Sequence, residues 1–385
     1  METNIQIGYD KKEDQEEVRR LWQAAFHDPE AFADYYFQWI YPENRVITAM
    51  EGEHLRSMLH LNPYQWHWGN DWILRLHYVV GVATEVEFRR QGLMAQCLTK
   101  ALQDMEKAGE PFTYLMPAKQ EYYLPFQFVP VHEEKRWVKR GADWYYNTGG
   151  KWEKGIPKGI AEKQNQYYPL RSQVYRERLK AEMECEGGDL IEWGAGNYCA
   201  YGLEPREGAD TVVIQQLFLQ EITAALNSSE TENSSSLPNQ VKTTTIDILE
   251  QQICPELYRR YGEIPIEYME TQNMMLRILD LERFLEILPY EKEGKQLPIH
   301  LSDPICKRNN GSFLLTLSSE GSTLEPVEEL VSESVAGTVT EPIVERTSEP
   351  VAADTSAYQW DISQLTAYLI EESQLSDKLY LMEIV

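Results

Sequence analysis

Residues 78–109 constrain the fold of this chain more than any other stretch. They open with an apolar, β-branched run, Tyr78–Thr84, which predicts a buried strand. A short basic segment with one glycine follows, and apolar residues then recur at helical spacing until Gly109. The sequence therefore predicts a strand, a tight basic loop and a helix in direct succession.

The predicted loop lies where the first backbone N–H groups of the helix have no partner within the helix. The helix dipole adds partial positive charge at the same place. Gly92 lets the backbone approach an anion closely, and Arg89 and Arg90 add charge. The loop lacks the Lys-Ser/Thr of a P-loop and the three glycines of a dinucleotide-binding fold. We therefore predict a phosphate site of another kind, the alternative being an ordinary strand–turn–helix with a solvated arginine pair.

Composition excludes several classes of partner. The net charge of −26 comes with no compensating basic patch, which argues against nucleic acid and suits a cationic substrate. The five cysteines are scattered without a CxxC pair, so neither a disulfide framework nor a zinc site is indicated, and we expect no metal. Without a signal peptide or an apolar run of about 18 residues, we expect a cytoplasmic protein that binds no membrane.

The first third of the chain has the predicted order β-α-α-β-β-β-α, followed by another strand. This order is mixed rather than strictly alternating, which argues against a doubly wound sheet and for an α+β fold. Strands are expected at residues 5–9, 45–50, 55–61, 72–84 and 112–117, and helices at 11–26, 31–40 and 93–108.

The remaining sequence is long enough for further domains, since 385 residues suit two or three. Strands followed by a helix recur after residue 148, as in a second copy of the first part that lacks the Arg-x-x-Gly loop. Residues 227–239 are polar and 320–354 acidic, so we expect loops there, whereas the apolar C-terminus suggests burial. Strands are expected at 137–146, 189–193, 196–203, 211–214, 269–279, 297–301, 311–317 and 358–362, and helices at 160–183, 215–226, 247–261, 280–288 and 363–373.

The basic loop resembles the pyrophosphate loop of GNAT N-acetyltransferases, Arg/Gln-x-x-Gly-x-Gly/Ala. Arg89 and Gly92 match that pattern, while Met94 departs from its small last residue. In that family the strand after the loop helix splays from its neighbour, and the pantetheine arm of acetyl-CoA inserts there. The resemblance implies acetyl-CoA as co-substrate, bound by Val82, Ala83, Thr84, Arg89, Arg90, Gln91, Gly92, Leu93 and Met94.

The segment after residue 117 carries a second resemblance. Tyr123-x-x-Phe126-x-Phe128 is similar to the family signature Tyr-x-x-Phe-Gly-Tyr/Phe, with Gln127 in place of glycine. The resemblance implies that Tyr123 is the general acid beside the thioester sulfur. Tyr122 remains an alternative, and so does a packing role for both tyrosines.

Over nearly its whole length the chain resembles the Eis-like (enhanced intracellular survival type) acetyltransferases. The motifs that carry this resemblance are VATEVEFRRQGLM, LMPAKQEYYLPFQF, MMLRILDLERFLEIL, LSDPICKRNNGSFLLT and the terminal LMEIV. It implies tandem GNAT folds, with mixed, mostly antiparallel sheets and flanking helices, at 1–147 and 148–285. It further implies a sterol-carrier-protein-like α/β sandwich at 286–385, and a homo-oligomer that in this family is commonly a hexamer.

The same resemblance implies that the chain ends in the active site, where the α-carboxylate of Val385 acts as the base. The expected function is acetyl transfer from acetyl-CoA to a primary amine of a cationic small molecule or a lysine side chain. The alternative is a lipid- or small-ligand-binding protein on a non-catalytic CoA-binding scaffold. The sequence does not specify which amine is acetylated.

Overall fold

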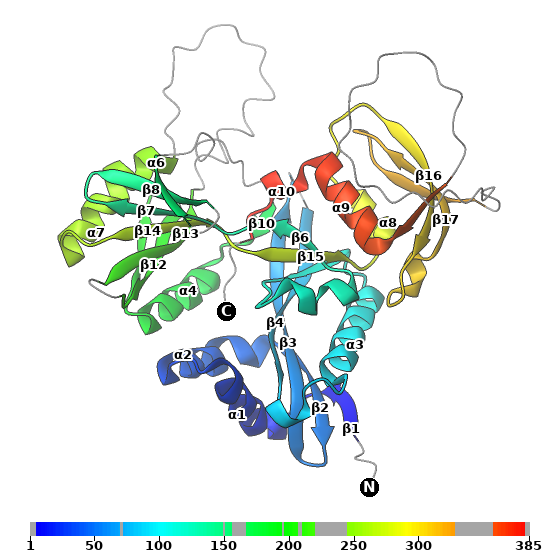
Figure 1. Cartoon of the computed structure of the whole chain (residues 1–385), viewed down its shortest axis with the longest axis horizontal. Coiled ribbons are helices and arrows are strands. Elements are labelled where there is room, and N and C mark those ends of the chain that lie inside the picture. The colour runs from blue at the N-terminus through cyan, green and yellow to red at the C-terminus, as the bar shows by residue number, and fades with distance from the viewer. Residues whose placement is uncertain are drawn as a thin grey trace, which may run out of the picture.

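The computed structural model describes residues 5–69, 72–148, 151–155, 167–194, 196–206, 210–219, 245–327 and 357–381. The chain forms three β-sheets with helices packed on them (Figure 1). Pairing within the sheets is mostly antiparallel, so the architecture is α+β, as the sequence predicts. Among the described residues, no helix combines the length and apolar character needed to span a bilayer.

The first sheet contains the predicted strand–loop–helix unit. Its order is β1-β2-β3-β4-β5-β15-β6, and β10 pairs with β3 outside this path. The predicted order of elements is confirmed, and the strand Trp72–Thr84 and the helix Leu93–Ala108 have their expected bounds. The strands are β1 (Ile5–Tyr9), β2 (Arg45–Glu51), β3 (His54–Trp68), β4 (Trp72–Thr84), β5 (Phe112–Leu115), β6 (Val129–His132), β10 (Tyr167–Pro169) and β15 (Met274–Ile278).

Amphipathic helices cover this sheet because each has one apolar stripe to bury. Helix α1 (Gln15–Phe26) buries Val18, Leu21 and Trp22 together with α2 (Glu30–Tyr35) and the π-helical turn Tyr36–Ile40. Helix α3 (Leu93–Ala108) buries its own stripe in a separate and larger core cluster. The basic loop therefore lies at the end of a rigid strand and a well-packed helix.

The second sheet has the order β11-β12-β13-β14-β7-β8-β9. It packs against the amphipathic helix α7 through a core that contains Trp137, Ile214 and Leu257. Its elements are β7 (Lys135–Arg140), β8 (Asp143–Thr148), β9 (Lys151–Lys154), α4 (Gln173–Cys185), β11 (Asp189–Trp193), β12 (Asn197–Glu204), β13 (Thr211–Phe218), α6 (Thr245–Ile248), a π-helical turn (Leu249–Ile253), α7 (Cys254–Tyr261) and β14 (Ile266–Thr271).

Four sequence predictions in this part need correction. The single strand expected at 137–146 is the hairpin β7–β8, which turns at Gly141 with a left-handed φ of 58°. The strand expected at 269–279 is two strands, β14 and β15, in different sheets. A break of two residues between apolar runs leaves no periodic signal, which is why the pattern suggested one strand.

The helices expected at 160–183 and 215–226 are the other two corrections. Residues 167–169 form strand β10, and α4 begins only at Gln173, where the Ser172 hydroxyl accepts a hydrogen bond from the Tyr175 N–H. Strand β13 continues to Phe218, and every residue in it is buried. A strand buried on both faces shows no alternation of apolar and polar residues, which is why the sequence suggested a helix after residue 214. Residues 160–166, 220–226 and 227–239 lie outside the described part of the chain.

The third sheet has the order β18-β17-β16-β19 and carries helices α8, α9 and α10. Asp280 caps α8 as predicted, accepting a hydrogen bond from the Arg283 N–H, whereas α9 begins one residue early and is capped by Asp361. Of the acidic stretch, residues 328–354 lie outside the described part. The elements are α8 (Leu281–Ile287), β16 (Lys295–Ser302), β17 (Gly311–Leu317), β18 (Thr323–Pro326), β19 (Tyr358–Asp361), α9 (Ile362–Ser373) and α10 (Leu375–Lys378).

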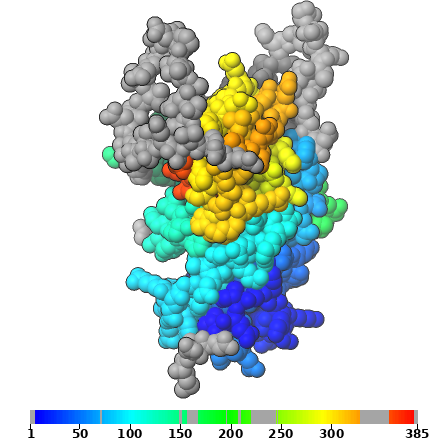
Figure 2. Space-filling view, turned by 90° about the vertical axis from the view of Figure 1, so that its right-hand side faces the viewer, coloured from blue at the N-terminus to red at the C-terminus, as the bar shows by residue number. Residues whose placement is uncertain are grey.

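The first two sheets exchange strands across the expected domain boundary at 147, whereas all four strands of the third sheet follow residue 285. Strands β7 and β8 belong to the second sheet although they precede residue 149, and β15 inserts between β5 and β6 of the first sheet. The third sheet packs on the first through one continuous core cluster, and Figure 2 shows its yellow and orange residues directly against the cyan part of the chain. The division into three domains stays a prediction.

Candidate active site

The basic loop between β4 and α3 contains two left-handed residues. Arg90 has φ of 62° and Gly92 has φ of 80°, and Gly92 is the N-cap residue of α3. Left-handed residues in a tight loop can turn successive N–H groups toward one side, which makes a concavity for an anion. A Cβ atom at Gly92 would meet no atom within 4 Å, so the space beside the loop is open. The backbone geometry of the loop and the N-terminus of α3 thus both favour an anion site beside Gly92.

Two side chains of the loop hold its shape. The Arg89 Nε donates to the Thr84 carbonyl oxygen at 3.1 Å, and the Gln91 Nε2 donates to the Glu87 carbonyl oxygen at 3.0 Å. Both bonds tie the loop to the end of β4 and the turn after it. Arg89 and Arg90 are exposed, so both charges face solvent beside the open space.

Strands β4 and β5 separate on the side that leads to this loop. They pair at one position, Tyr78 with Tyr114, and from Val79 to Thr84 the described residues give β4 no strand neighbour on that side. Strand β4 also bulges at Gly81, whose φ is 60° and whose missing Cβ would lie 2.6 Å from the Trp22 ring. The splayed edge, which includes Val82, Ala83 and Thr84, can therefore pair with an extended ligand arm.

Tyr123 lies between two successive 3-10 turns after β5, Gln120–Tyr122 and Leu124–Phe126. Its ring is buried and packs edge-on against Phe128 at 5.9 Å, and burial raises the pKa of Tyr123 to about 12. Within the described part of the chain, its hydroxyl has no hydrogen-bond partner. Tyr122 is 55% exposed. The two tyrosines thus differ in exposure. Tyr123 has the burial expected of a group that contacts a thioester, and Tyr122 does not.

Gln127, the departure from the family signature, occupies the position where a glycine is favoured. Its φ is 63°, and its N–H donates to the Leu124 carbonyl oxygen at 2.9 Å. A left-handed residue other than glycine costs about 1 kcal/mol or more. The turn therefore keeps the conformation that glycine would give, at the cost of some backbone strain.

Most of the predicted site residues lie in the strand–loop–helix unit of β4 and α3, and Tyr123 follows β5. Leu93 and Tyr123 belong to one core cluster, and Val82 and Met94 pack against it. Val385 lies outside the described residues. The last described residues are buried between the first two sheets: the Tyr380 N–H donates to the Tyr167 carbonyl oxygen at 2.9 Å, and its hydroxyl to the Leu217 carbonyl oxygen at 3.3 Å.

A cleft of about 430 Å³ lies between α2, β3 and β4 on one side and α4 on the other. Its walls carry Asn44, Asn62 and Arg75 from the first sheet and its helices, and Arg178 and Glu182 from α4. Sequence reasoning missed this cleft because its two walls come from residues more than a hundred positions apart. Asn44 and Asn62 each leave a buried amide atom unpaired among the described residues, but a sequence does not show pairing.

The Tyr36 hydroxyl organises polar groups at the floor of this cleft. It accepts a hydrogen bond from the Asn44 Nδ2 at 2.8 Å, donates to the Asn62 Oδ1 at 3.3 Å, and bonds the His60 Nδ1 at 2.9 Å. This leaves the Asn44 Oδ1 and the Asn62 Nδ2 buried and unpaired among the described residues. Buried polar atoms without partners are costly, so a ligand that pairs with them would gain affinity.

His60 itself stays neutral. It is fully buried against the β4 bulge, and burial lowers the pKa of His60 to about 3. The hydrogen bonds around Tyr36 are all satisfied when His60 carries its proton on Nδ1. His60 therefore supports the cleft floor as a neutral donor and not as a cation.

Comparison with known proteins gives the class of the first part of the chain. Residues 7–131 match the acetyltransferase (GNAT) domain family, and this range includes the basic loop and Tyr123. The chain thus contains a GNAT acetyltransferase domain. No curated protein matches the sequence.

Three solved structures resemble most or nearly all of the chain in fold. A probable N-acyltransferase of unknown function from Enterococcus faecalis V583 has TM-score 0.62 and 14% identity, covering 98% of this chain and 97% of its own. A GCN5-related N-acetyltransferase from Anabaena variabilis has TM-score 0.57 and 13% identity, covering 99% and 98%. Eis1 from Mycobacterium abscessus has TM-score 0.53 and 12% identity, covering 83% and 84%. At these identities the likeness concerns the fold.

Proposed function

We propose that this protein transfers an acetyl group from acetyl-CoA to a primary amine of a cationic small molecule or a lysine side chain. One observation carries the proposal: the basic loop, the splayed edge of β4 and the buried Tyr123 lie in the part of the chain that matches the GNAT domain. These features fit the three parts of acetyl-CoA, namely its diphosphate, its pantetheine arm and its thioester.

The loop residues from Arg89 to Met94 would bind the diphosphate through backbone N–H groups, supported by the charges of Arg89 and Arg90. Val82, Ala83 and Thr84 would pair with the pantetheine arm along the free edge of β4. A backbone N–H of this edge that points at the thioester carbonyl would stabilise the transition state by about 3–4 kcal/mol.

Tyr123 would donate its proton or a hydrogen bond to the departing sulfur. With a pKa near 12 the hydroxyl is fully protonated at neutral pH, which suits a donor and not a base. Tyr122 is too exposed for the same role.

The amine would enter the cleft between α2 and α4 and lose its proton there. We propose the Val385 α-carboxylate for this step, because the chain before it is buried beside the cleft: Gln216 lines the cleft, and the next carbonyl, that of Leu217, accepts from Tyr380. The carboxylate would hold the ammonium group and accept its proton directly or through water. Burial would raise its pKa toward the range that a base needs.

We further propose the Eis-like arrangement, with the second sheet as a degenerate GNAT unit and the third as a sterol-carrier-protein-like unit. Likeness in fold to Eis1 over 83% of the chain, and to the Enterococcus and Anabaena structures over 98% and 99%, supports it. A cytoplasmic homo-oligomer, as large as a hexamer, is part of the same proposal. Sedimentation at several protein concentrations would test the assembly.

The deciding experiment is thiol release from acetyl-CoA with a panel of amines that includes aminoglycosides, polyamines and a lysine peptide. We expect release with at least one cationic amine and none from the Gly92→Glu variant. If no amine gives release while lipid co-purifies with the protein, the function is ligand binding on a non-catalytic scaffold.

A further inference from the structure

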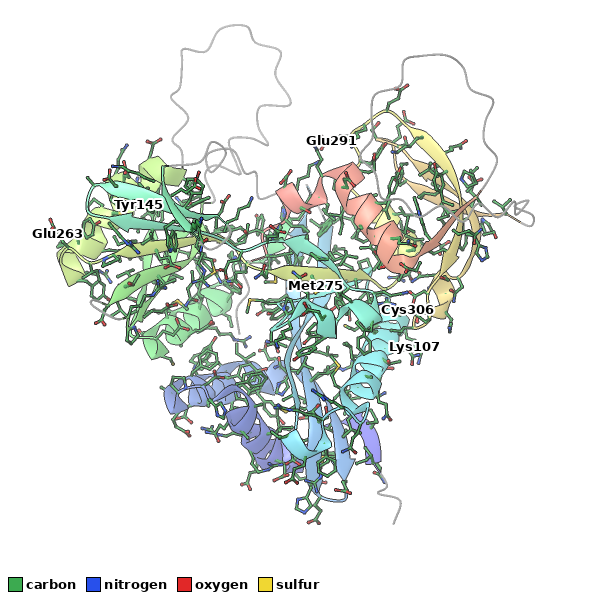
Figure 3. All side chains as sticks on the ribbon, viewed as in Figure 1. Lys107, Tyr145, Glu263, Met275, Glu291 and Cys306 are labelled. Atoms are coloured by element: carbon green, nitrogen blue, oxygen red, sulfur yellow. The ribbon has the colours of Figure 1, made fainter. Side chains whose placement is uncertain are left out.

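Arg277 of β15 is fully buried, and its guanidinium group reaches two other segments of the chain. A buried arginine needs a counter-charge and well-directed acceptors to offset the loss of water. Strand β15 inserts between β5 and β6, in the centre of Figures 1 and 3, where the latter labels the neighbouring residue Met275. Arg277 therefore lies where the first sheet meets the segment after β5.

The first bond of Arg277 goes to the turn that carries Tyr123. Its Nε donates to the Phe126 carbonyl oxygen at 2.8 Å. The same turn is closed on Tyr123, whose carbonyl oxygen accepts the N–H groups of Phe126 at 3.0 Å and Phe128 at 3.4 Å. The Phe126 carbonyl belongs to the peptide that enters Gln127, the left-handed residue with φ of 63°. Arg277 thus holds the strained peptide of this turn.

The second bond goes to the segment that connects β16 and β17 of the third sheet. The Arg277 Nη2 donates to the Asp303 Oδ1 at 2.7 Å, and both side chains are fully buried. Asp303 in turn accepts from the N–H groups of Ile305 and Cys306, each at 2.9 Å. Figure 3 places Cys306 near α3, and the Arg277 Nη1 also contacts its sulfur at 3.4 Å.

One planar guanidinium therefore joins the turn that carries Tyr123 to the segment between β16 and β17. The Arg fork keeps two acceptors in a fixed relative position, which a lysine ammonium cannot do. We propose that Arg277 is a positioning residue for Tyr123, and that the third sheet sets this position through Asp303. The inference rests on the proposed function, since it requires the Tyr123 hydroxyl to act on the thioester.

A double-mutant cycle between Arg277→Lys and Tyr123→Phe tests the coupling. We expect Arg277→Lys to lower kcat by about 10²-fold with an unchanged KM for acetyl-CoA, because displacement of a catalytic group by about 1 Å has this effect. In the Tyr123→Phe background the same substitution should lower kcat no further, because the hydroxyl that it positions is already gone.

Glu267→Gln is the matched control, since Glu267 is also a buried carboxylate paired with an arginine, Arg136 at 2.9 Å, but in the second sheet. It should leave kcat unchanged. If Arg277→Lys is not folded by circular dichroism, Asp303→Asn replaces it in the cycle.

The outcomes separate the two proposals. If the kcat losses of Arg277→Lys and Tyr123→Phe multiply in the double variant, Arg277 does not act through Tyr123, and this inference is overturned while the proposed function stands. If Tyr123→Phe alone leaves kcat unchanged, the proposed role of Tyr123 is overturned, and the inference with it.

Discussion

The hydroxyl of Tyr35 donates a hydrogen bond to the Glu182 carboxylate at 3.1 Å, although the two residues are 147 positions apart in the sequence. Tyr35 ends α2, and Glu182 lies in α4, so this bond joins the two walls of the proposed acceptor cleft. Burial, and then the nearby Glu182 charge, raise the pKa of Tyr35, which keeps its hydroxyl a donor at any physiological pH.

Replacing Tyr35 by Phe should loosen the cleft. A buried hydrogen bond to a charged group contributes about 1.5–3 kcal/mol, so the free energy of unfolding should fall by that amount. The KM for the amine should rise, and the KM for acetyl-CoA should not, because the splayed edge of β4 is untouched. Tyr146→Phe is the control, since it removes an exposed bond to Glu153 in the second sheet. Equal changes of both KM values would show that Tyr35 does not shape the acceptor cleft specifically.

Substitution of Gly92 by Glu should abolish acetyl-CoA binding measured by calorimetry. A carboxylate beside the loop repels the diphosphate, and φ of 80° strains any side chain there. Gly52→Glu is the matched control, because Gly52 has φ of 63° in the β2–β3 hairpin turn and equally open space. Acetyl-CoA binding should survive in Gly52→Glu. It should be lost in the double variant Arg89→Ala with Gly92→Glu. Retained binding in Gly92→Glu would show that the diphosphate binds elsewhere.

Replacing Tyr123 by Phe should lower kcat by about 10²–10⁴-fold with little change in KM, as loss of a general acid does. Tyr122→Phe is the control and should leave kcat unchanged, because Tyr122 is 55% exposed. Thiol-release kinetics at saturating acetyl-CoA measure both variants. A larger loss in Tyr122→Phe would reverse the assignment.

Extending the chain by one residue beyond Val385, or amidating it, should lower kcat/KM by about 10²–10⁴-fold if the terminal carboxylate is the base. Affinity for acetyl-CoA should be unchanged. Val385→Leu keeps the carboxylate in register and should stay active. Full activity of the amidated protein would remove the terminus from the mechanism.

Because His60 is buried and neutral, we expect the folded protein to lose stability in mild acid. In the unfolded chain its pKa is about 6.5, whereas burial holds it at about 3 in the folded protein, so the unfolded state binds more protons between these values. The stability contributed by neutral His60 is complete above pH 6.5 and falls by about 1.4 kcal/mol per unit as pH drops toward 3.

Urea unfolding at pH 6 and pH 5 tests this dependence. His60→Gln removes the titrating group while keeping a side chain that can bond the Tyr36 hydroxyl. Its free energy of unfolding should change less between the two pH values, by about 1 kcal/mol. The same change in both proteins would assign the acid sensitivity to other groups.

Much of the local structure follows from local sequence. The capping residues Asp280 and Gly109, and the apolar stripe between Leu93 and Met105, are interactions among residues a few positions apart, and the sequence displays them directly. Errors occurred where a strand is buried on both faces, as in β13, or where a break between strands is short, as between β14 and β15.

For the candidate site, the sequence by itself determined the loop, because a glycine, two arginines and a helix start are contiguous and their chemistry is local. Tertiary structure alone decided the burial that separates Tyr123 from Tyr122, the cleft between Tyr35 and Glu182, and the contact of Arg277 with Phe126 and Asp303. The physical reason is that burial and long-range hydrogen bonds depend on which surfaces pack together. That choice is made by the whole core and by no segment on its own.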